Sequence, residues 1–446
     1  MSSFFADMRS HRHALWLFIP FVLFYASSYF QRTAIPGTAF NDLQTAYGLT
    51  AAQIAGIGAS FLYIYSFCQI IIGWLADKYG GVRIASVGGA IFCAGVVTFP
   101  FFGGNMPLMC LSRFLTGLGA SSLYLSLVRE IDRVFGRKNY SVMLGIVYFV
   151  GYAGGLFGTL PYAQLCKYFN WNGILIWIGV ISACLYTVFM AARPTVPPAP
   201  VSAEPLSLKP LWVLMKNPFV WVLLVNTAMP FATYSLIQMV FGIKFLQDFA
   251  GMKHTAAAAV VFSMTLTSMF TILGSGILTR LISNRRKPLL ITSAALVLAN
   301  TVFMFAAVRF NLPGWCFAAG YLLFAAASGL TMVNIMLVQE LNSRDTMTLA
   351  AGFMNLAGYL SVAVFSMLIG LLLDSFVPPD AFAAGKTVIY PGKAYMTLFG
   401  LLMIPASISF GLSFLVPETG GHYLHNCILD RIRHTPDGTA YCQVNK

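Results

Sequence analysis

Twelve apolar segments, each long enough to cross a lipid bilayer, recur along this chain of 446 residues. About 20 apolar residues in a helix span the hydrocarbon core of a membrane. Charged residues make up only 9% of the chain, whereas they are about a quarter of a soluble protein. We therefore predict an all-α polytopic membrane protein with 12 transmembrane helices. The expected spans are 14–40, 51–75, 84–103, 108–128, 141–164, 172–191, 218–246, 256–279, 288–308, 313–337, 347–373 and 395–417.

Basic residues are distributed unevenly among the segments that join these spans. With the N-terminus inside, 19 lysines and arginines fall in inner loops and tails, and six, including Lys244, fall in outer loops. This bias predicts a multi-pass protein with both termini cytoplasmic. Compact loops favour a bacterial-type cell inner (plasma) membrane. The net charge of +13 thus reflects topology, so we expect the lipid bilayer and no nucleic acid as a partner.

The spans fall into two sets of six. A Pro-rich stretch at Ala191–Pro218 separates them and is typical of an extended linker. The loops "GWLADKYGGVR" (Gly73–Arg83) and "GILTRLISNRRKP" (Gly276–Pro288) each begin with Gly, keep Leu two residues later and end in basic residues. Such similarity indicates a duplicated six-helix unit. We predict an N-terminal six-helix bundle at 1–192, a cytoplasmic linker at 193–217, a C-terminal six-helix bundle at 218–417 and a cytoplasmic tail at 418–446.

The first of these loops resembles the loop 2–3 signature of the major facilitator superfamily, roughly G-x-L-a-D-r-x-G-r-[RK]-x. The matching residues are Gly73, Leu75, Ala76, Asp77, Lys78 and Gly80, whereas Gly81 and Val82 replace the usual basic pair. The stretch "SRFLTGLGAS" (Ser112–Ser121) is similar to the family's helix 4 pattern R-x-x-x-G-x-G. The resemblance implies two pseudo-symmetric six-helix bundles of the major facilitator fold. It also implies alternating access to a small-molecule site at mid-membrane.

The loop 2–3 motif also suggests a cytoplasmic gate. Glycines such as Gly73 and Gly80 let helix ends approach closely. Asp77 can pair with Arg129, and Arg83 can meet Glu130 or Asp132. Such pairs hold one conformation and separate in another. Simple positive-inside anchoring by these basic residues is the alternative.

Two arginines, Arg32 and Arg113, fall inside apolar spans. An arginine at the centre of a membrane helix costs roughly 2.5–3.5 kcal/mol on insertion scales. At about 100° per residue, Tyr25, Ser28 and Arg32 share one helix face, and Arg113, Gly117 and Tyr124 share another. No Asp or Glu lies in the middle of any span.

An unpaired guanidinium in a cavity can bind a carboxylate or phosphate bidentately. We therefore hypothesise that Arg32 binds an anionic or zwitterionic substrate. The alternatives are that Arg32 snorkels to the outer interface or bonds backbone carbonyls. For Arg113 a structural role is the favoured interpretation, because the family motif occurs with very different substrates.

The resemblance implies that helices 1, 4, 7 and 10 line the cavity and that helices 2, 5, 8 and 11 contribute. Further candidate substrate-binding residues are Tyr63, Gln69, Tyr152, Tyr234, Gln238, Asn334, Asn355 and Tyr359. Polar side chains in spans also hold helices together. Phosphate-handling relatives often carry a second arginine on helix 7, which this chain lacks. A monocarboxylate, an amino acid or a small polar metabolite therefore suits the site better than a phosphate ester.

The combined prediction is a secondary active or facilitative transporter of a small polar metabolite. One alternative is a multidrug or metabolite efflux antiporter, although "GYAGGLFGTLP" (Gly151–Pro161) lacks the Gly-Pro of the antiporter motif. Another is a transporter-like ligand sensor without transport. No nucleophile–base set, phosphate loop or metal-ligand spacing is present, so we expect no enzyme, cofactor or metal site. We also expect a monomer, with Asp42 at the outer mouth as the sole titratable group near the core.

Overall fold

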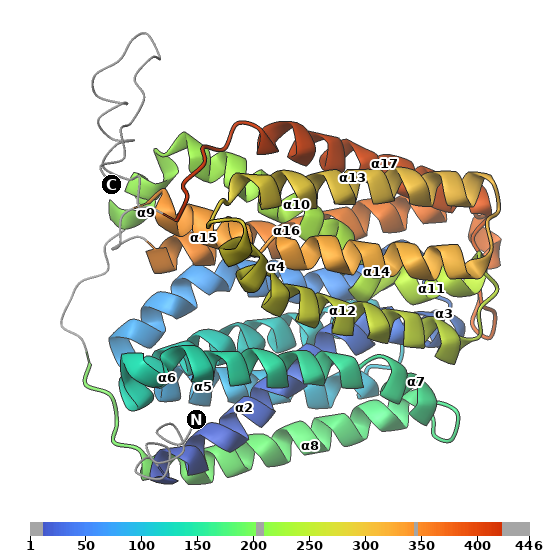
Figure 1. Ribbon diagram of the computed structural model, residues 1–446. Coiled ribbons are helices and arrows are strands. Elements are labelled where there is room, and N and C mark those ends of the chain that lie inside the picture. The colour runs from blue at the N-terminus through green and yellow to red at the C-terminus, as the bar shows by residue number, and fades with distance from the viewer. Residues whose placement is uncertain (1–11, 202–208, 343–346, 422–446) are drawn as a thin grey trace.

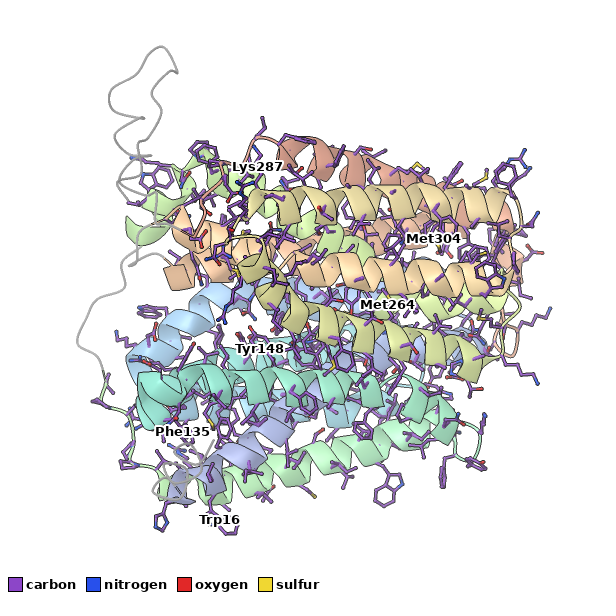
Figure 2. The ribbon with its side chains drawn as sticks, viewed as in Figure 1. Trp16, Phe135, Tyr148, Met264, Lys287 and Met304 are labelled. Carbon is purple, nitrogen blue, oxygen red and sulfur yellow. The ribbon has the colours of Figure 1, made fainter. Side chains whose placement is uncertain are left out.

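The part of the chain that the structure describes contains twelve helices long and apolar enough to cross a membrane, as predicted. The computed structural model describes residues 12–201, 209–342 and 347–421 (Figure 1). Their spans run His13–Thr38, Ala51–Tyr79, Gly81–Phe101, Met106–Gly136, Val142–Leu165, Trp171–Thr195, Pro218–Asp248, His254–Leu281, Lys287–Arg309, Gly314–Glu340, Gly352–Asp374 and Gly392–Ser413. Large apolar side chains such as Trp16, which is 71% exposed and points away from the helices in Figure 2, cover the lipid-facing surface.

The first six spans form the N-terminal half. Its elements are α2 (Arg12–Thr33), η1 (Ala34–Thr38), α3 (Phe40–Tyr47), α4 (Ala51–Tyr79), α5 (Gly81–Thr98), η2 (Phe99–Phe101), α6 (Met106–Phe157), α7 (Leu160–Leu165), α8 (Trp171–Ala192) and η3 (Arg193–Thr195). The long α6 contains two spans that meet at Gly136, where φ is +67°.

The last six spans form the C-terminal half, which lies above the N-terminal half in Figure 1. Its elements are α9 (Lys209–Met215), α10 (Pro218–Leu236), η4 (Ile237–Phe241), α11 (Gly242–Asp248), α12 (His254–Leu281), α13 (Lys287–Arg309), α14 (Gly314–Leu330), α15 (Val333–Glu340), α16 (Met347–Asp374), η6 (Pro379–Ala381) and α17 (Gly392–Ser413). We call the end that carries η3 and α9 the linker end, and the end that carries α3 and α7 the opposite end.

The first and seventh spans are both interrupted. In the first, Ile35 has the extended angles φ −123° and ψ 120° between α2 and α3. The residue before a proline avoids the helical region, and Pro36 lacks an N–H for the helical ladder. The seventh span contains the π-helical segment η4. A Cβ on Gly37 would lie 2.7 Å from the Met239 carbonyl oxygen, so the two interruptions touch through a position that only glycine allows.

Ion pairs at the linker end lie within each half. Asp77 pairs with Arg129 at 3.3 Å, which confirms that predicted ion pair. The predicted pairing of Arg83 with Glu130 or Asp132 is wrong, because Arg83 Nη1 donates to the Tyr79 carbonyl. Glu130 instead pairs with Arg133 of the next helical turn and accepts from the Val82 N–H.

The C-terminal half repeats part of this arrangement with different residues. Glu340, at the end of α15, pairs with Arg286 at the start of α13, 3.0 Å away. Glu130 likewise joins the fourth span of its half to the start of the third. Arg280, which aligns with Asp77, is exposed. The two halves are therefore braced alike, but only the first carries the Asp77–Arg129 pair.

Hydrogen bonds between the two halves concentrate at the opposite end. Within 12–201, 209–342 and 347–421, the hydrogen bonds between the halves lie at this end, apart from the bond that Arg32 donates to Tyr359. The described residues thus fasten the halves together at the opposite end and make no such bond at the linker end.

Candidate substrate site and gate

Arg32 lies at the centre of the molecule, in the last turn of α2 before the interruption. Only 2% of the residue is exposed, so its side chain does not snorkel to the membrane surface. Four aromatic rings surround the guanidinium carbon, with ring centroids 4.2–5.6 Å away: Tyr29, Phe61, Tyr65 and Tyr359. Rings at this distance stabilise a cation through their π faces. The aromatic enclosure makes the buried charge tolerable without an acid.

The guanidinium is only partly hydrogen-bonded. Arg32 Nη1 donates to the Tyr359 hydroxyl at 2.9 Å. Its Nε and Nη2 atoms are buried and, among the residues that the structure describes, have no hydrogen-bond partner. No described Asp or Glu lies within ion-pair distance. Buried donors without acceptors are costly, and charged ones most of all. Nε and Nη2 together form one side of the guanidinium fork, the side that grips a carboxylate.

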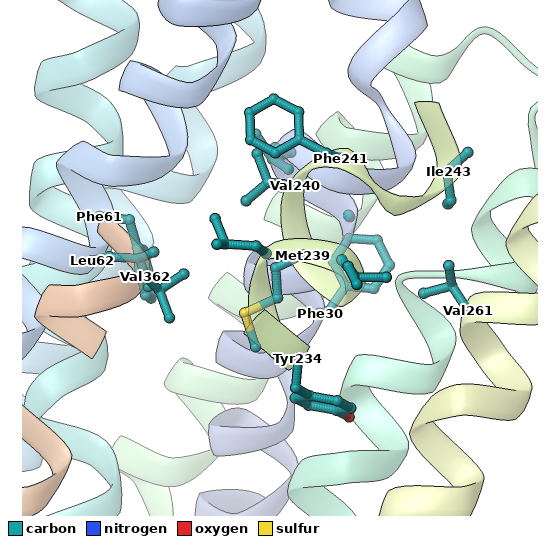
Figure 3. Close-up of a cluster of buried hydrophobic side chains, with 14 of the residues drawn as sticks. Phe30, Phe61, Leu62, Tyr234, Met239, Val240, Phe241, Ile243, Val261 and Val362 are labelled. Carbon is teal, nitrogen blue, oxygen red and sulfur yellow. The ribbon is translucent and has the colours of Figure 1, made fainter. Parts of the chain in front are cut away.

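One face of this site is closed by apolar side chains. A pocket of about 10 Å³ lies beside Arg32 and Arg113, which is room for about one water molecule. Its apolar walls include Phe61 and Leu62 of α4 and Met239 and Val240 of η4, which Figure 3 shows close together. A ligand larger than water must therefore reach Arg32 from elsewhere.

Arg113 has a different environment from Arg32. Its Nη2 donates to the carbonyl oxygens of Gln31 and Ile35, both at 3.0 Å, and Nη1 donates to the Gln31 side chain at 3.4 Å. An interrupted helix leaves carbonyls without intrahelical partners, and these must be satisfied in a membrane. Arg113 thus holds the break in the first span, and its two terminal nitrogens are occupied.

A chain of tyrosines extends from Arg32. Ring centroids are 5.6 Å apart for Tyr29 and Tyr152, and 5.9 Å apart for Tyr25 and Tyr124. The hydroxyls of Tyr124 and Tyr148 are 2.6 Å apart, and Tyr148 is 39% exposed between the halves in the view of Figure 2. The predicted residues Tyr25, Tyr124, Tyr152 and Tyr359 thus belong to one aromatic cluster with Arg32.

The remaining predicted residues divide into two groups. Gln69 is 2% exposed, and neither of its amide atoms has a partner in the described part of the chain, while Tyr63 and Asn355 are half-buried. The Tyr234 hydroxyl likewise has none. Three others bond to protein groups: Ser28 to Tyr25 O, Gln238 to Thr265, and Asn334 to Asn226 O. Gln69, Tyr234 and the side-chain oxygen of Asn334 therefore have no partner among the described residues and are open to a ligand.

Three residues of the site were missed by sequence reasoning. Tyr29, Phe61 and Tyr65 face Arg32, although they lie outside the predicted set of substrate-binding residues. The signal was helical spacing: Tyr29 precedes Arg32 by one turn, and Phe61 and Tyr65 are one turn apart.

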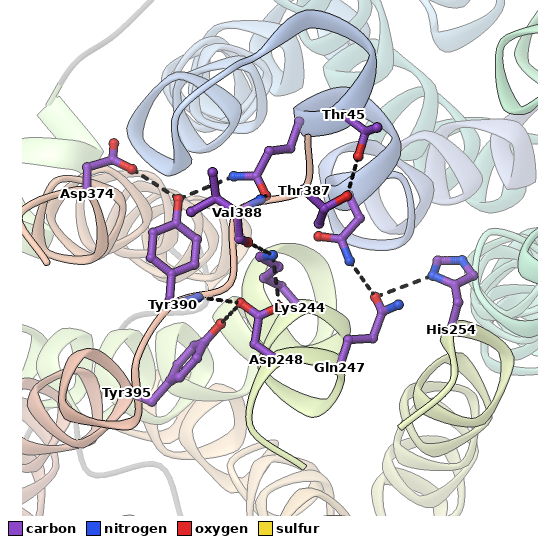
Figure 4. A network of polar contacts seen from close by, with 12 residues as sticks. Thr45, Lys244, Gln247, Asp248, His254, Asp374, Thr387, Val388, Tyr390 and Tyr395 are labelled. Atoms are coloured by element: carbon purple, nitrogen blue, oxygen red, sulfur yellow. Dashed lines mark hydrogen bonds and ion pairs between the residues drawn. The ribbon is translucent and has the colours of Figure 1, made fainter. Parts of the chain in front are cut away.

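The opposite end is closed by residues 383–390, which we call the strap. Its Thr387 hydroxyl lies 2.6 Å from that of Thr45 in α3, and its Val388 N–H donates to Gln44. Asp374 accepts from the first two N–H groups of α4 at 2.8 Å each, a stabilising place for an anion. Figure 4 shows this network, in which the strap bridges the two halves.

Lys244 and Asp248 anchor the strap from the C-terminal half. The prediction of Lys244 as an outer-loop residue is wrong, because the seventh span continues through η4 into α11 and buries both side chains. Lys244 Nζ lies 2.9 Å from Asp248 and also donates to the Val388 carbonyl. Asp248 in turn accepts from the Tyr390 N–H and the Tyr395 hydroxyl.

Asp42 lies in α3 at the same end, and its Oδ2 is buried with no partner in the part of the chain described. Burial raises the pKa of Asp42 to about 6. A carboxyl with a raised pKa stabilises the fold when protonated, so its contribution is full below about pH 4 and is lost as the pH rises through about 6. We expect melting temperatures across pH 4–7 to fall less steeply with rising pH in Asp42→Asn than in the parent. Equal slopes would show that Asp42 does not titrate in this way.

Comparison with known proteins identifies the family. Residues 21–366 match the Major Facilitator Superfamily. Relatives include the probable anion transporter 6, chloroplastic, of Arabidopsis thaliana (25% identical over 140 residues, 31% of this chain and 27% of the relative). Another is the probable sulfoacetate transporter SauU of Cupriavidus necator, which is 26% identical over 176 residues, or 39% of this chain and 40% of the relative. Human monocarboxylate transporter 2 is 27% identical over 153 residues, or 33% of this chain and 31% of the relative. The matched segments thus span about a quarter to two fifths of these relatives.

Solved structures share the fold over nearly the whole chain. A D-xylose–proton symporter superposes with a TM-score of 0.73 at 14% identity, covering 92% of this chain and all of that one. A point mutant of the nucleoside transporter NupG gives 0.70 at 14% identity, covering 91% and 98%. With twelve spans, two halves and a family match over most of its length, the chain belongs to the Major Facilitator Superfamily of membrane transporters.

Proposed function

We propose that the protein transports a small organic monoanion with a carboxylate head group, by alternating access, and that Arg32 binds the carboxylate. The observation that carries this proposal is the buried fork of Arg32, whose Nε and Nη2 donors have no described partner. A bound carboxylate would supply the two missing acceptors and the missing negative charge at once.

The surroundings of the site favour a substrate with a single negative charge. Arg113 is the nearest second arginine, but its Nη1 and Nη2 are bound to Gln31 and Ile35. Lys244 is held by Asp248 at the opposite end. A dianion would bring a second charge into this aromatic enclosure, where Arg113 offers only its Nε, the one guanidinium nitrogen of that residue without a described partner. The relatives named as monocarboxylate transporters support a carboxylate monoanion, and Gln69 and Tyr234 offer polar atoms for the rest of the substrate.

Alternating access is supported by the uneven bonding of the two halves. The strap and Asp374 close the opposite end, whereas the linker end has no described polar bond between the halves. We assign the protein to the cell inner membrane, with the linker end on the cytoplasmic side. The N-terminal bundle would then end at residue 192 and the C-terminal bundle would begin at residue 218. Gly73, Asp77, Gly80, Arg129 and Glu130 would then act as cytoplasmic gating residues.

A cross-link tests the gate. The Thr45 and Thr387 hydroxyls are 2.6 Å apart, which is compatible with a disulfide between cysteines at these positions. We expect oxidised Thr45→Cys/Thr387→Cys protein to stop transporting, and reduction to restore the rate. Each single cysteine variant under the same oxidation is the control. Transport at the parent rate with the cross-link formed would show that this end does not open.

Binding can be measured before any transport assay. Ligands raise the melting temperature of the state that they bind. A panel of monocarboxylates, dicarboxylates, amino acids, sugar phosphates and neutral sugars should contain a monocarboxylate that stabilises the purified protein but not Arg32→Met. Stabilisation of both proteins by a neutral sugar alone would contradict the proposed site.

A further inference from the structure

A second cavity lies at the linker end, and its lining residues differ from those around Arg32. Its volume is about 440 Å³, and it lies between the start of α5, the end of α8 and the first residues of the linker. The residues that matter here are Gly80, Arg83, Glu130, Met190 and Arg193. None of them belongs to the proposed carboxylate site.

The outer wall of this cavity is the linker itself. The Pro197 carbonyl accepts from Arg133 Nη1 at 3.0 Å, and Val196 is buried. A Cβ on Gly80 would lie 2.5 Å from the Ala199 Cβ, and Gly80 has φ +89°. The linker therefore packs against the loop between α4 and α5 at a position where only glycine fits. The linker thus forms one wall of the cavity through a defined contact.

The charge in the cavity is positive. Arg83 donates to the Tyr79 carbonyl, and within the described residues neither Arg83 nor Arg193 has an acidic partner. Glu130 also lines the cavity, but its carboxylate is bound by Arg133 and by the Val82 N–H. Two arginines thus line this space without a counter-ion from the described part of the protein.

The level of the cavity matches that of lipid head groups. It lies where the second and sixth spans end and the third span begins. Lys78 lies over the Trp74 ring in the last turns of α4. Aromatic and basic residues gather where membrane helices leave the hydrocarbon core. Met190 and Val82 add apolar walls beside the two arginines. Basic pockets between helices at this level bind anionic head groups.

We propose that this cavity binds a phosphate group through Arg83 and Arg193, supplied by an anionic phospholipid or by a soluble phosphate compound. Two arginine forks suit the several oxygens of a phosphate. Because Arg193 and Pro197 belong to the linker, an occupied site would also fix the linker on the N-terminal half. The inference does not depend on the substrate.

The test compares nanodiscs of phosphatidylcholine with nanodiscs that contain phosphatidylglycerol. Phosphatidylglycerol should raise the melting temperature of the parent protein, and lipid retention by native mass spectrometry should be about 30-fold weaker in Arg83→Gln/Arg193→Gln. The matched control is Arg280→Gln/Arg285→Gln, which removes two exposed arginines from the linker end of the other half and should keep parent-like retention.

A second arm identifies the source of the phosphate. Inorganic phosphate and glycerol 3-phosphate are added to the phosphatidylcholine nanodiscs. Stabilisation by these compounds that Arg83→Gln/Arg193→Gln loses would assign a soluble ligand, and an effect of phosphatidylglycerol alone would assign the lipid. Equal loss in the control variant, or no effect of any phosphate source, would overturn the proposal.

Discussion

Replacing Arg32 with methionine is expected to weaken carboxylate binding by at least about 100-fold while leaving the protein folded. Hydrogen bonds to charged groups contribute about 1.5–3 kcal/mol each, and two of them account for that loss at about 1.4 kcal/mol per factor of ten. Methionine fills much of the space among the aromatic rings and removes a buried charge that has no acidic partner among the described residues. The melting temperature without ligand should therefore stay close to that of the parent.

Two further arginine variants make this prediction specific. Arg32→Lys keeps the charge but loses the planar fork, so we expect binding between that of the parent and that of Arg32→Met. Arg113→Met removes the donors to Gln31 O and Ile35 O, so it should lower the melting temperature of the ligand-free protein instead. Isothermal titration and thermal melting of the three variants separate these outcomes. A stable Arg32→Met protein with parent affinity would remove Arg32 from the site.

Replacing Asp248 with leucine should be the most destabilising single change at the opposite end. It leaves the Lys244 ammonium, whose side chain is fully buried, without its carboxylate 2.9 Å away. Removing one partner of a buried ion pair costs about 3–5 kcal/mol, because the other charge stays desolvated. It also removes the acceptor of the Tyr390 N–H, which belongs to the strap, and of the Tyr395 hydroxyl in α17, so the strap should loosen.

A double variant separates the charge from the packing. Lys244→Met/Asp248→Asn has no buried charge and keeps an amide oxygen for the Tyr390 N–H and the Tyr395 hydroxyl. We expect the double variant to melt at a higher temperature than Asp248→Leu. If Asp248→Leu melts like the parent, the pair does not stabilise this end.

Much of the fold was predictable because a membrane requires long apolar helices. All twelve spans and the Asp77–Arg129 pair agree with the expectations from sequence. Arg83 does not pair with Glu130, because Arg133 lies one turn from Glu130 on the same helix and binds its carboxylate instead. Lys244 lies two residues before the end of the expected span 218–246, and it is not an outer-loop residue because the seventh span runs on to Asp248.

The role of Arg113 depended on structure for a related reason. Its two carbonyl partners become available only because the first span breaks at Ile35. Pro36 marks the position of that break, but the sequence does not say which side chain satisfies the freed groups. The aromatic enclosure of Arg32 comes from three different helices, and one sequence without pairing information cannot bring them together.

Counterflow in proteoliposomes tests the central claim most directly. Vesicles loaded with unlabelled lactate, pyruvate or acetate are diluted into the same compound in labelled form, with vesicles of Arg32→Met protein as the control. The account predicts transient accumulation of label for at least one monocarboxylate by the parent and none by Arg32→Met. Equal accumulation by both proteins, or counterflow of a neutral sugar with no movement of any carboxylate, would contradict it.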